Sequence, residues 1–301
     1  MKDLVKIRNK DLQVEVSPVV GASIFSMKYN REGEWVDIMR LTPEEAVASK
    51  DVGSFASFNL FPYSNRIEDA LLKFKGDEYQ LGDEVNHAIH GDSRKKPWQV
   101  VEVDESKVIL EFDSTKYKDI LWPFPFIAKI EYKLEGNSFI VRTLLKNQGA
   151  QLMPGGMGIH PYFMRNISSK VEKIKLDMET IGLYPGETQI PTGHWVNPPE
   201  KWNFTGNREL TTEFLDNCFM AGTGPIRITW QDSDLKLLIE RDELFKHVVI
   251  YCPVGEEFFA LEPVTNCNNG FNMAEDGIED TGIIEIEPEQ EVVGEIKFTV
   301  N

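Results

Sequence analysis

Apolar and polar residues alternate along much of the chain, with the period of two that is typical of β-strands buried on one face. Near the start, Leu12, Val14 and Val16 alternate with Gln13 and Glu15. Similar alternation recurs further along the sequence, in the segments 128–134, 226–230, 235–239, 245–251 and 294–300. We therefore predict strands from one end of the chain to the other.

Turn and helix signals connect these segments. The sequence EGN at 135–137 separates the alternating segment 128–134 from the apolar run 139–145, which is typical of a β-hairpin. The sequence TPEE at 42–45 resembles a capping box with proline at the first helical position, and it predicts a helix of about two turns. Such helical signals are few. The fold class is therefore all-β, with one large antiparallel β-sandwich and few short helices in a single domain over 1–301.

The composition is that of a globular protein with a strong negative charge. Hydrophobic residues make up 41% of the 301 residues, and 49 Asp and Glu against 32 Lys and Arg give a net charge of −17. At this length a chain buries a core large enough to fold without disulfides or structural metals. The charge repels phosphate backbones and anionic headgroups, so neither nucleic acid nor a membrane surface is an expected partner.

Cysteine usage and the N-terminal sequence indicate a reducing compartment. Cys218, Cys252 and Cys267 are odd in number and far apart, without the C-x-x-C spacing of zinc ribbons or dithiol redox sites. The first residues lack the apolar segment of a signal peptide, and no apolar run approaches the length of a membrane-spanning helix. We expect a cytoplasmic protein.

Two polar residues lie in apolar or aromatic segments. His160 belongs to GIHPYF at 158–163, where an imidazole can bind a ligand oxygen and carry a proton near neutral pH. The alternative is a histidine satisfied by a backbone carbonyl. Glu262 lies near the end of FFALEP at 258–263, and an unpaired buried carboxylate is expensive. It is therefore either a salt-bridge partner or a general base in a cleft.

Other polar residues are candidates for ligand binding. His87 and His90 have an H-x-x-H spacing but no third ligand at a defined offset, so a metal site is not predicted, and a polar loop or a sugar-contacting histidine remain open. Arg66 offers fixed donors that suit sugar hydroxyls or a phosphate, unless it is simply exposed after a turn. Asp216 can accept bonds from a hydroxyl pair or belong to an ordinary turn.

The order of these motifs resembles the aldose 1-epimerase (galactose mutarotase) family. The motifs are NRI at 65–67, HG at 90–91, HPYF at 160–163, Asp216 and LEP at 261–263, and HPYF and LEP are the most specific. The resemblance extends over nearly the whole chain, from VSP at 16–18 to the segment 262–272. Ile159 stands where galactose-type mutarotases usually carry Asn, and Asn266 where many relatives have His. The resemblance thus implies no particular sugar.

The resemblance implies a fold, a mechanism and a set of site residues. The fold would be the large antiparallel supersandwich of that family. Glu262 would act as general base and His160 as general acid in opening the ring of a free aldose, while Arg66, His90 and Asp216 would bind the substrate. No nucleotide or metal motif is present, and this mechanism requires no cofactor. Two alternatives stay open, a hexose-6-phosphate 1-epimerase of the same fold and a carbohydrate-binding protein without turnover.

A basic cluster bears on whether the substrate is a free sugar or a sugar phosphate. Arg94, Lys95 and Lys96 follow the HG motif and are candidate phosphate contacts, with a solvated basic turn as the alternative. Trp98 is expected to hold this segment against the core. We therefore predict that the cluster points to solvent and that the substrate is a neutral aldose. We also predict that His160 and Glu262, far apart in sequence, line one cleft.

Overall fold

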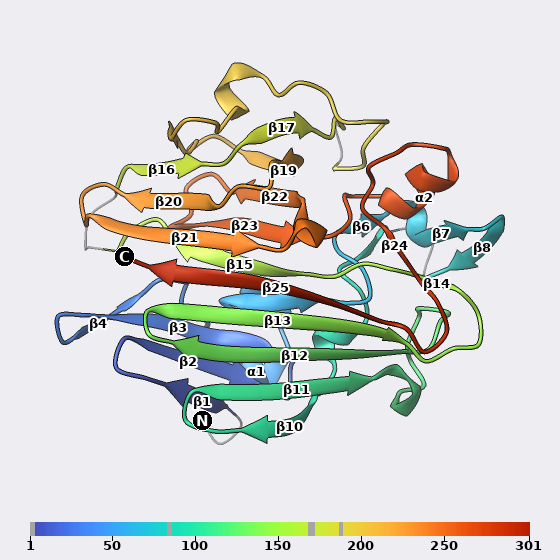
Figure 1. Cartoon of the computed structure of the whole chain (residues 1–301), viewed down its shortest axis with the longest axis horizontal. Coiled ribbons are helices and arrows are strands. Elements are labelled where there is room, and N and C mark those ends of the chain that lie inside the picture. Colours follow the sequence, from blue (N-terminus) through green and yellow to red (C-terminus); the bar gives the residue numbers. More distant parts are fainter. Residues whose placement is uncertain (1–3, 83–85, 168–171, 187–188) are drawn as a thin grey trace.

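Two large antiparallel sheets lie face to face in the computed structural model, which describes residues 4–82, 86–167, 172–186 and 189–301 (Figure 1). One sheet has ten strands in the order β1-β2-β3-β5-β15-β23-β22-β19-β17, with β4 also paired to β3. The other has nine, in the order β10-β11-β12-β13-β25-β21-β20-β16-β18. Three two-stranded sheets pair β14 with β24, β6 with β9 and β7 with β8. The predicted antiparallel β-sandwich is confirmed.

The elements have the following bounds. The ten-stranded sheet consists of β1 (Val5–Arg8), β2 (Leu12–Ser17), β3 (Ser23–Arg31), β4 (Glu34–Asp37), β5 (Ser57–Leu60), β15 (Gly158–Met164), β17 (Thr180–Leu183), β19 (Leu215–Ala221), β22 (His247–Cys252) and β23 (Phe258–Val264). The nine-stranded sheet consists of β10 (Gln99–Val103), β11 (Lys107–Asp113), β12 (Phe126–Glu135), β13 (Ser138–Asn147), β16 (Ile174–Asp177), β18 (Arg208–Glu209), β20 (Ile226–Trp230), β21 (Leu235–Arg241) and β25 (Glu291–Val300). The small sheets contain β6 (Arg66–Ile67), β7 (Leu71–Phe74), β8 (Asp77–Gln80), β9 (Ala88–Ile89), β14 (Met153–Gly155) and β24 (Ile284–Ile286), and the α-helices are α1 (Glu45–Ser49) and α2 (Gly270–Glu275).

The alternating segments form strands as predicted, except at Phe245, and the predicted helix is shorter than expected. The hairpin of β12 and β13 closes between Glu135 and Ser138, as the EGN turn predicts. Phe245 was expected in a strand but ends a short 3-10 helix before β22. The helix predicted after Thr42 exists as α1, yet it has only five residues. The Thr42 hydroxyl does not cap it, because it donates to the carbonyl of Phe25 and accepts from the N–H of Ala56.

The ten-stranded sheet is buried on both faces, because apolar side chains pack on each side of it. Residues such as Ile159 and Phe163 of β15 belong to the core between the two large sheets. Phe58 and Tyr162 belong to a second apolar cluster, together with Val249 and other residues of the opposite face. Since successive residues of a strand point to opposite faces, even-numbered residues of β15 and β23 point away from the inter-sheet core. This outer face carries the candidate site.

The described residues contain three buried, free cysteines and no helix long and apolar enough to cross a membrane.

Candidate active site

A cavity of about 370 Å³ opens on the outer face of the ten-stranded sheet. Its lining comprises Asn65, Arg66, His90, His160, Tyr162, Gln189, Phe214, Asp216, Tyr251 and Glu262. The structure therefore brings together the five residues to which the family resemblance assigns a role, Arg66, His90, His160, Asp216 and Glu262. The strands β15, β23, β22 and β19, which are neighbours in the sheet, supply the floor.

Strand register places His160 beside Glu262. The strands β15 and β23 are antiparallel, with Gly158 opposite Val264 and Tyr162 opposite Ala260, so that His160 and Glu262 face each other midway between these pairs. Nε2 of His160 lies 3.1 Å from Oε1 of Glu262, and both side chains are buried. The histidine and the glutamate predicted to share one cleft are in direct contact.

Burial shifts the pKa values of His160 and Glu262 in opposite directions. Desolvation lowers the pKa of His160 well below its usual value, and the positive charge of Arg40 adds to this effect. Desolvation also raises the pKa of Glu262 well above its usual value, with a further contribution from the nearby Asp216 carboxylate. A neutral histidine with a protonated glutamate and an imidazolium with a carboxylate hold the same number of protons. Both shifts favour the neutral pair over the ion pair, so the shared proton is held on Glu262 more readily than the ordinary pKa values of the two groups would allow.

Each member of the pair also has a polar atom that no group in the described part of the chain satisfies. Nδ1 of His160 and Oε2 of Glu262 are buried and lack a hydrogen-bond partner among the described residues. An unpaired buried polar atom costs about 1–3 kcal/mol, so such atoms mark places where a ligand or a water is expected to bind.

Aromatic rings fix the orientation of His160. The ring of Phe58 stacks on the imidazole with centroids 4.5 Å apart, and the Tyr162 hydroxyl lies 3.5 Å from Nε2. His90 meets His160 edge to face, with centroids 5.4 Å apart. The imidazole is therefore held between rings and has little freedom to leave Glu262.

His90 is oriented by an unusual backbone conformation. Its φ is 62°, and Gly91 follows with a φ of 70°. A Cβ atom at position 91 would lie 1.9 Å from the carbonyl oxygen of Phe61, so only glycine fits there. Nδ1 of His90 accepts a hydrogen bond from the N–H of Asn65, and burial lowers the pKa of His90 well below its usual value. A neutral His90 therefore carries its proton on Nε2 and can donate it to a ligand hydroxyl.

Arg66 and Asp216 form the charged part of the cavity. Nη2 of Arg66 lies 3.8 Å from Oδ2 of Asp216, and Nη1 donates to the side-chain oxygen of Asn65 at 3.0 Å. Burial raises the pKa of Asp216, whereas the Arg66 charge lowers it. Arg66 and Asp216 thus place a hydrogen-bond donor and an acceptor in the same cavity as the His160–Glu262 pair.

Comparison with known proteins identifies the family of this chain. The model of the family described as aldose 1-epimerase matches residues 3–299. This chain belongs to the aldose 1-epimerase family. Among curated relatives, the Escherichia coli proteins YphB and YihR, both called uncharacterized, are 23% and 27% identical. The alignments cover 89% of this chain and 91% of YphB, and 72% of this chain and 72% of YihR.

Solved structures of other proteins share the fold. A galactose mutarotase-like protein from Clostridium acetobutylicum superposes with a TM-score of 0.87 at 19% identity, covering 99% of this chain and 95% of the other. A GalM/aldose epimerase homologue from Caenorhabditis elegans gives a TM-score of 0.80 at 19% identity, with coverage of 99% and 98%. The supersandwich predicted from the motifs is the fold of this aldose 1-epimerase family member.

Both differences from the usual family pattern lie outside the cavity lining. Ile159 is fully buried in the core between the sheets, on the face opposite to His160. Asn266 supports the backbone, since its amide group donates to the carbonyls of Ser64 and Cys267 and its oxygen accepts from the Ser64 N–H. Neither side chain reaches the place where a sugar would contact His160.

Several lining residues in this aldose 1-epimerase family member were not singled out from the sequence. Tyr251 was noted only as part of an alternating strand, although its period places it on the same face as Val249 and the site. Phe214 is 54% exposed and lies edge-on to Tyr251, with centroids 6.3 Å apart. Gln189 enters from a loop. The alternation along the strand predicts the face on which Tyr251 lies. No sequence signal near Gln189 or Phe214 predicts that these loop residues line the cavity.

The remaining candidates from the sequence are His87 and the basic cluster at 94–96. His87 lies outside the cavity lining, and its Nδ1 accepts from the N–H of Asp69. Within the described ranges, no group of three or more His, Cys, Asp and Glu side chains is placed to hold a metal ion.

The basic cluster is only partly exposed. Lys95 is exposed and Lys96 forms an ion pair with Asp119. The prediction that all three point to solvent is wrong for Arg94, which is half-buried with its guanidinium 5.9 Å from the Phe58 ring centre. Trp98 is buried, as expected, and its indole N–H donates to the Ser93 carbonyl, which holds the turn against the core.

Proposed function

We propose that this protein is an aldose mutarotase, which interconverts the α and β anomers of a free aldose. The observation that carries the proposal is the buried contact between His160 and Glu262 at the floor of a polar cavity. An acid and a base in direct contact, which share one proton, suit a reaction in which each group must both give and accept a proton.

Glu262 and His160 together supply the two proton transfers that opening the sugar ring requires. The Glu262 carboxylate accepts the proton of the C1 hydroxyl while the C1–O5 bond breaks and His160 delivers its proton to the ring oxygen. The open-chain aldehyde then rotates about its C1–C2 bond. For closure, the C5 hydroxyl returns its proton to His160, its oxygen attacks C1, and Glu262 protonates the carbonyl oxygen. No group is consumed, and each proton transfer contributes about 10²–10⁴-fold.

The remaining polar residues orient the sugar. Arg66 donates to ring hydroxyls, Asp216 accepts from them, and the Nε2–H of His90 donates from the neighbouring wall. Binding of this kind presents one edge of the pyranose to both catalytic groups and reduces the entropy cost of reaching the transition state.

The charge of the cavity favours a neutral aldose over a sugar phosphate. Arg66 is the single arginine or lysine among the described lining residues, and it already faces Asp216. A phosphate is typically held by several converging donors, often bidentate arginines. Arg94 lies close to Phe58 but does not line the cavity.

A carbohydrate-binding protein without turnover is the weaker alternative. Binding alone does not need a buried carboxylate beside a buried imidazole, a pair that costs stability to desolvate. Buried acid and base groups with strongly perturbed pKa values in a cleft are typical of catalytic sites.

Polarimetry tests the proposal. Freshly dissolved α-glucose, α-galactose and glucose 6-phosphate are followed with and without the protein, and with the Arg94→Ala variant. We expect faster mutarotation of at least one free aldose and no preference for the phosphate ester. No acceleration with any of them refutes the mutarotase proposal, and a preference for the phosphate that Arg94→Ala abolishes establishes the sugar phosphate as substrate.

A further inference from the structure

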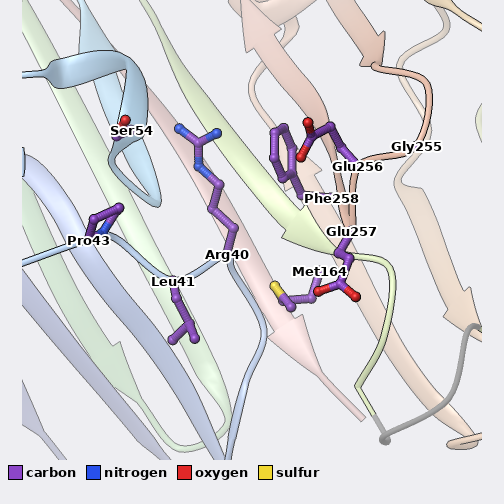
Figure 2. A pocket seen from close by; sticks show the side chains of 9 residues that line it. All are labelled: Arg40, Leu41, Pro43, Ser54, Met164, Gly255, Glu256, Glu257 and Phe258. Carbon is purple, nitrogen blue, oxygen red and sulfur yellow. The ribbon is translucent and has the colours of Figure 1, made fainter.

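Arg40 is a half-buried cation near the catalytic pair that the proposed reaction does not use. It lines a second hollow of about 340 Å³, and Figure 2 shows its side chain extending between Ser54 and Phe258. Arg40 does not line the catalytic cavity. Any effect of Arg40 on the reaction must therefore pass through another residue.

The backbone places Arg40 beside Tyr162 on the outer face of the ten-stranded sheet. Met39 forms an antiparallel bridge with Phe163, and the N–H of Arg40 donates to the Tyr162 carbonyl at 2.9 Å. Arg40 and Tyr162 are therefore cross-strand neighbours whose side chains lie on the same face, the face to which His160 also points.

The segment 53–55 holds the Arg40 guanidinium in place. Nε donates to the Phe55 carbonyl at 3.0 Å, and one terminal nitrogen donates to the Gly53 carbonyl. Because the guanidinium is rigid and planar, two bonds to backbone carbonyls determine its plane. Its position thus depends on a segment outside the catalytic cavity.

The ring of Tyr162 connects Arg40 with His160. The Arg40 guanidinium lies 3.5 Å from the centre of this ring, where a cation is attracted by the ring face. The imidazole centre of His160 lies 4.4 Å from the same ring centre, with 33° between the planes, and the Tyr162 hydroxyl is 3.5 Å from Nε2. The same Nε2 contacts Glu262 at 3.1 Å. A continuous chain of contacts therefore runs from Arg40 to the catalytic pair.

Arg40 also contributes to the electrostatic environment of His160. The charged and titratable groups around this imidazole are Glu262 on β23, Tyr162 on β15, Arg66 on β6, His90, Arg94 in the turn that follows it, and Arg40. Burial lowers the pKa of His160 most, and the charge of Arg40 lowers it further, ahead of Arg94 and Arg66. Removing the Arg40 charge should therefore raise the pH at which the His160–Glu262 pair takes up protons.

We propose that Arg40 is a positioning residue for His160, acting through the ring of Tyr162 to hold the imidazole against Glu262 for proton transfer. This inference rests on the proposed mutarotase function and adds a residue that does not touch the sugar. Because Arg40 acts on the acid and not on substrate binding, its loss should lower kcat and leave KM nearly unchanged.

The experiment compares Arg40→Met and Arg40→Lys with a matched arginine of the other sheet. The guanidinium of Arg241 on β21 also donates to backbone carbonyls, those of Phe245, Gly224 and Gly222. It does not line the catalytic cavity, so Arg241→Met is the control. For each protein, kcat and KM for the best free aldose are measured by polarimetry across pH. The imidazole of His160 is titrated by NMR, with His160→Asn to assign its signal.

For Arg40→Met we expect kcat to fall about tenfold with KM within about twofold, because a misplaced acid loses part of its advantage in proton transfer. The pH profile and the His160 titration should both move to higher pH. Arg40→Lys keeps a cation for the Tyr162 ring without the planar fork, so it should restore the pH profile and part of kcat. Arg241→Met should leave kcat, KM and the His160 titration unchanged.

The path through Tyr162 has its own test. In the Tyr162→Leu background the connecting ring is absent, so adding Arg40→Met should lower kcat little further. An equal effect of Arg40→Met with and without the Tyr162 ring overturns the proposal.

Unchanged kcat and an unchanged His160 titration in Arg40→Met, or a rise in KM alone, also overturn the positioning role while leaving the mutarotase proposal intact. If Arg40→Met does not fold, Arg40→Lys decides, since a wild-type kcat in that variant overturns the role. If the wild type turns over no sugar, the mutarotase proposal fails, and the His160 titration still decides whether Arg40 acts on His160.

Discussion

The buried His247 predicts a specific dependence of stability on pH. Its side chain is fully buried at the start of β22, with Nδ1 2.5 Å from the Thr265 carbonyl oxygen and Nε2 3.0 Å from the Tyr184 hydroxyl. Burial lowers the pKa of His247 to about 4, and this outweighs the carbonyl oxygens of Thr265 and Asp280, which favour the charged form. His247 thereby ties β22 to the segment that follows Glu262.

The sign and size of the effect follow from linkage. In the unfolded chain the imidazole takes up a proton below a pH of about 6.5, whereas the folded protein keeps it neutral until about pH 4. The stability that a neutral His247 contributes is therefore fully present above pH 6.5 and is lost as the pH falls toward 4. Between pH 7.5 and pH 5 the free energy of unfolding should fall by about 2 kcal/mol from this group.

Urea unfolding at pH 7.5, 6.5 and 5.0 measures this loss in the wild type and in His247→Gln. The variant retains a polar side chain without a titrating ring, so its free energy of unfolding should fall about 2 kcal/mol less over this range. His90 and His160 contribute equally to both proteins and cancel in the difference. Parallel curves for the two proteins would refute the argument.

Two further predictions concern the site itself. The acid limb of kcat/KM against pH should lie above the ordinary carboxyl range, because burial and the Asp216 charge raise the pKa of Glu262. The substitution Asp216→Asn should move that limb to lower pH. If the pH profile of the variant shows an unmoved limb, the assignment of Glu262 as the base is contradicted. Gly91→Ala should lower the free energy of unfolding by about 1–3 kcal/mol and raise KM, because the new Cβ cannot coexist with the Phe61 carbonyl; wild-type stability in urea and an unchanged KM would contradict this.

The strands were predictable because the sheet imposes a strict period of two on the sequence. The alternation at Leu12, Val14 and Val16 reports a buried face directly, and these three residues are fully buried in β2. Phe245 continues the apolar pattern but precedes the strand, because apolar spacing alone does not distinguish a short 3-10 turn from extended backbone. The TPEE sequence failed as a capping box because the Thr42 hydroxyl forms longer-range bonds to Phe25 and Ala56.

The site residues were predictable as a set of motifs but not as a geometry. Nothing in the sequence near His160 shows that Glu262 lies within hydrogen-bonding distance, since this depends on the register of β15 against β23. The stack of Arg40 on Tyr162 was also beyond prediction, because Arg40 belongs to a loop whose path is determined by tertiary contacts.

The central claim is that His160 and Glu262 act as one acid–base pair on a sugar. Magnetisation-transfer NMR measures it directly, through the exchange rate between the α and β anomers of the best substrate, with the wild type, Glu262→Gln, His160→Asn and the double variant. Glu262→Gln keeps the shape of the side chain, His160→Asn keeps a polar amide near the position of Nδ1, and both changes remove proton transfer. We therefore predict a fall in kcat of at least ~10²-fold for each, with the double variant little worse than the worse single one. Near-normal exchange with Glu262→Gln would contradict the account.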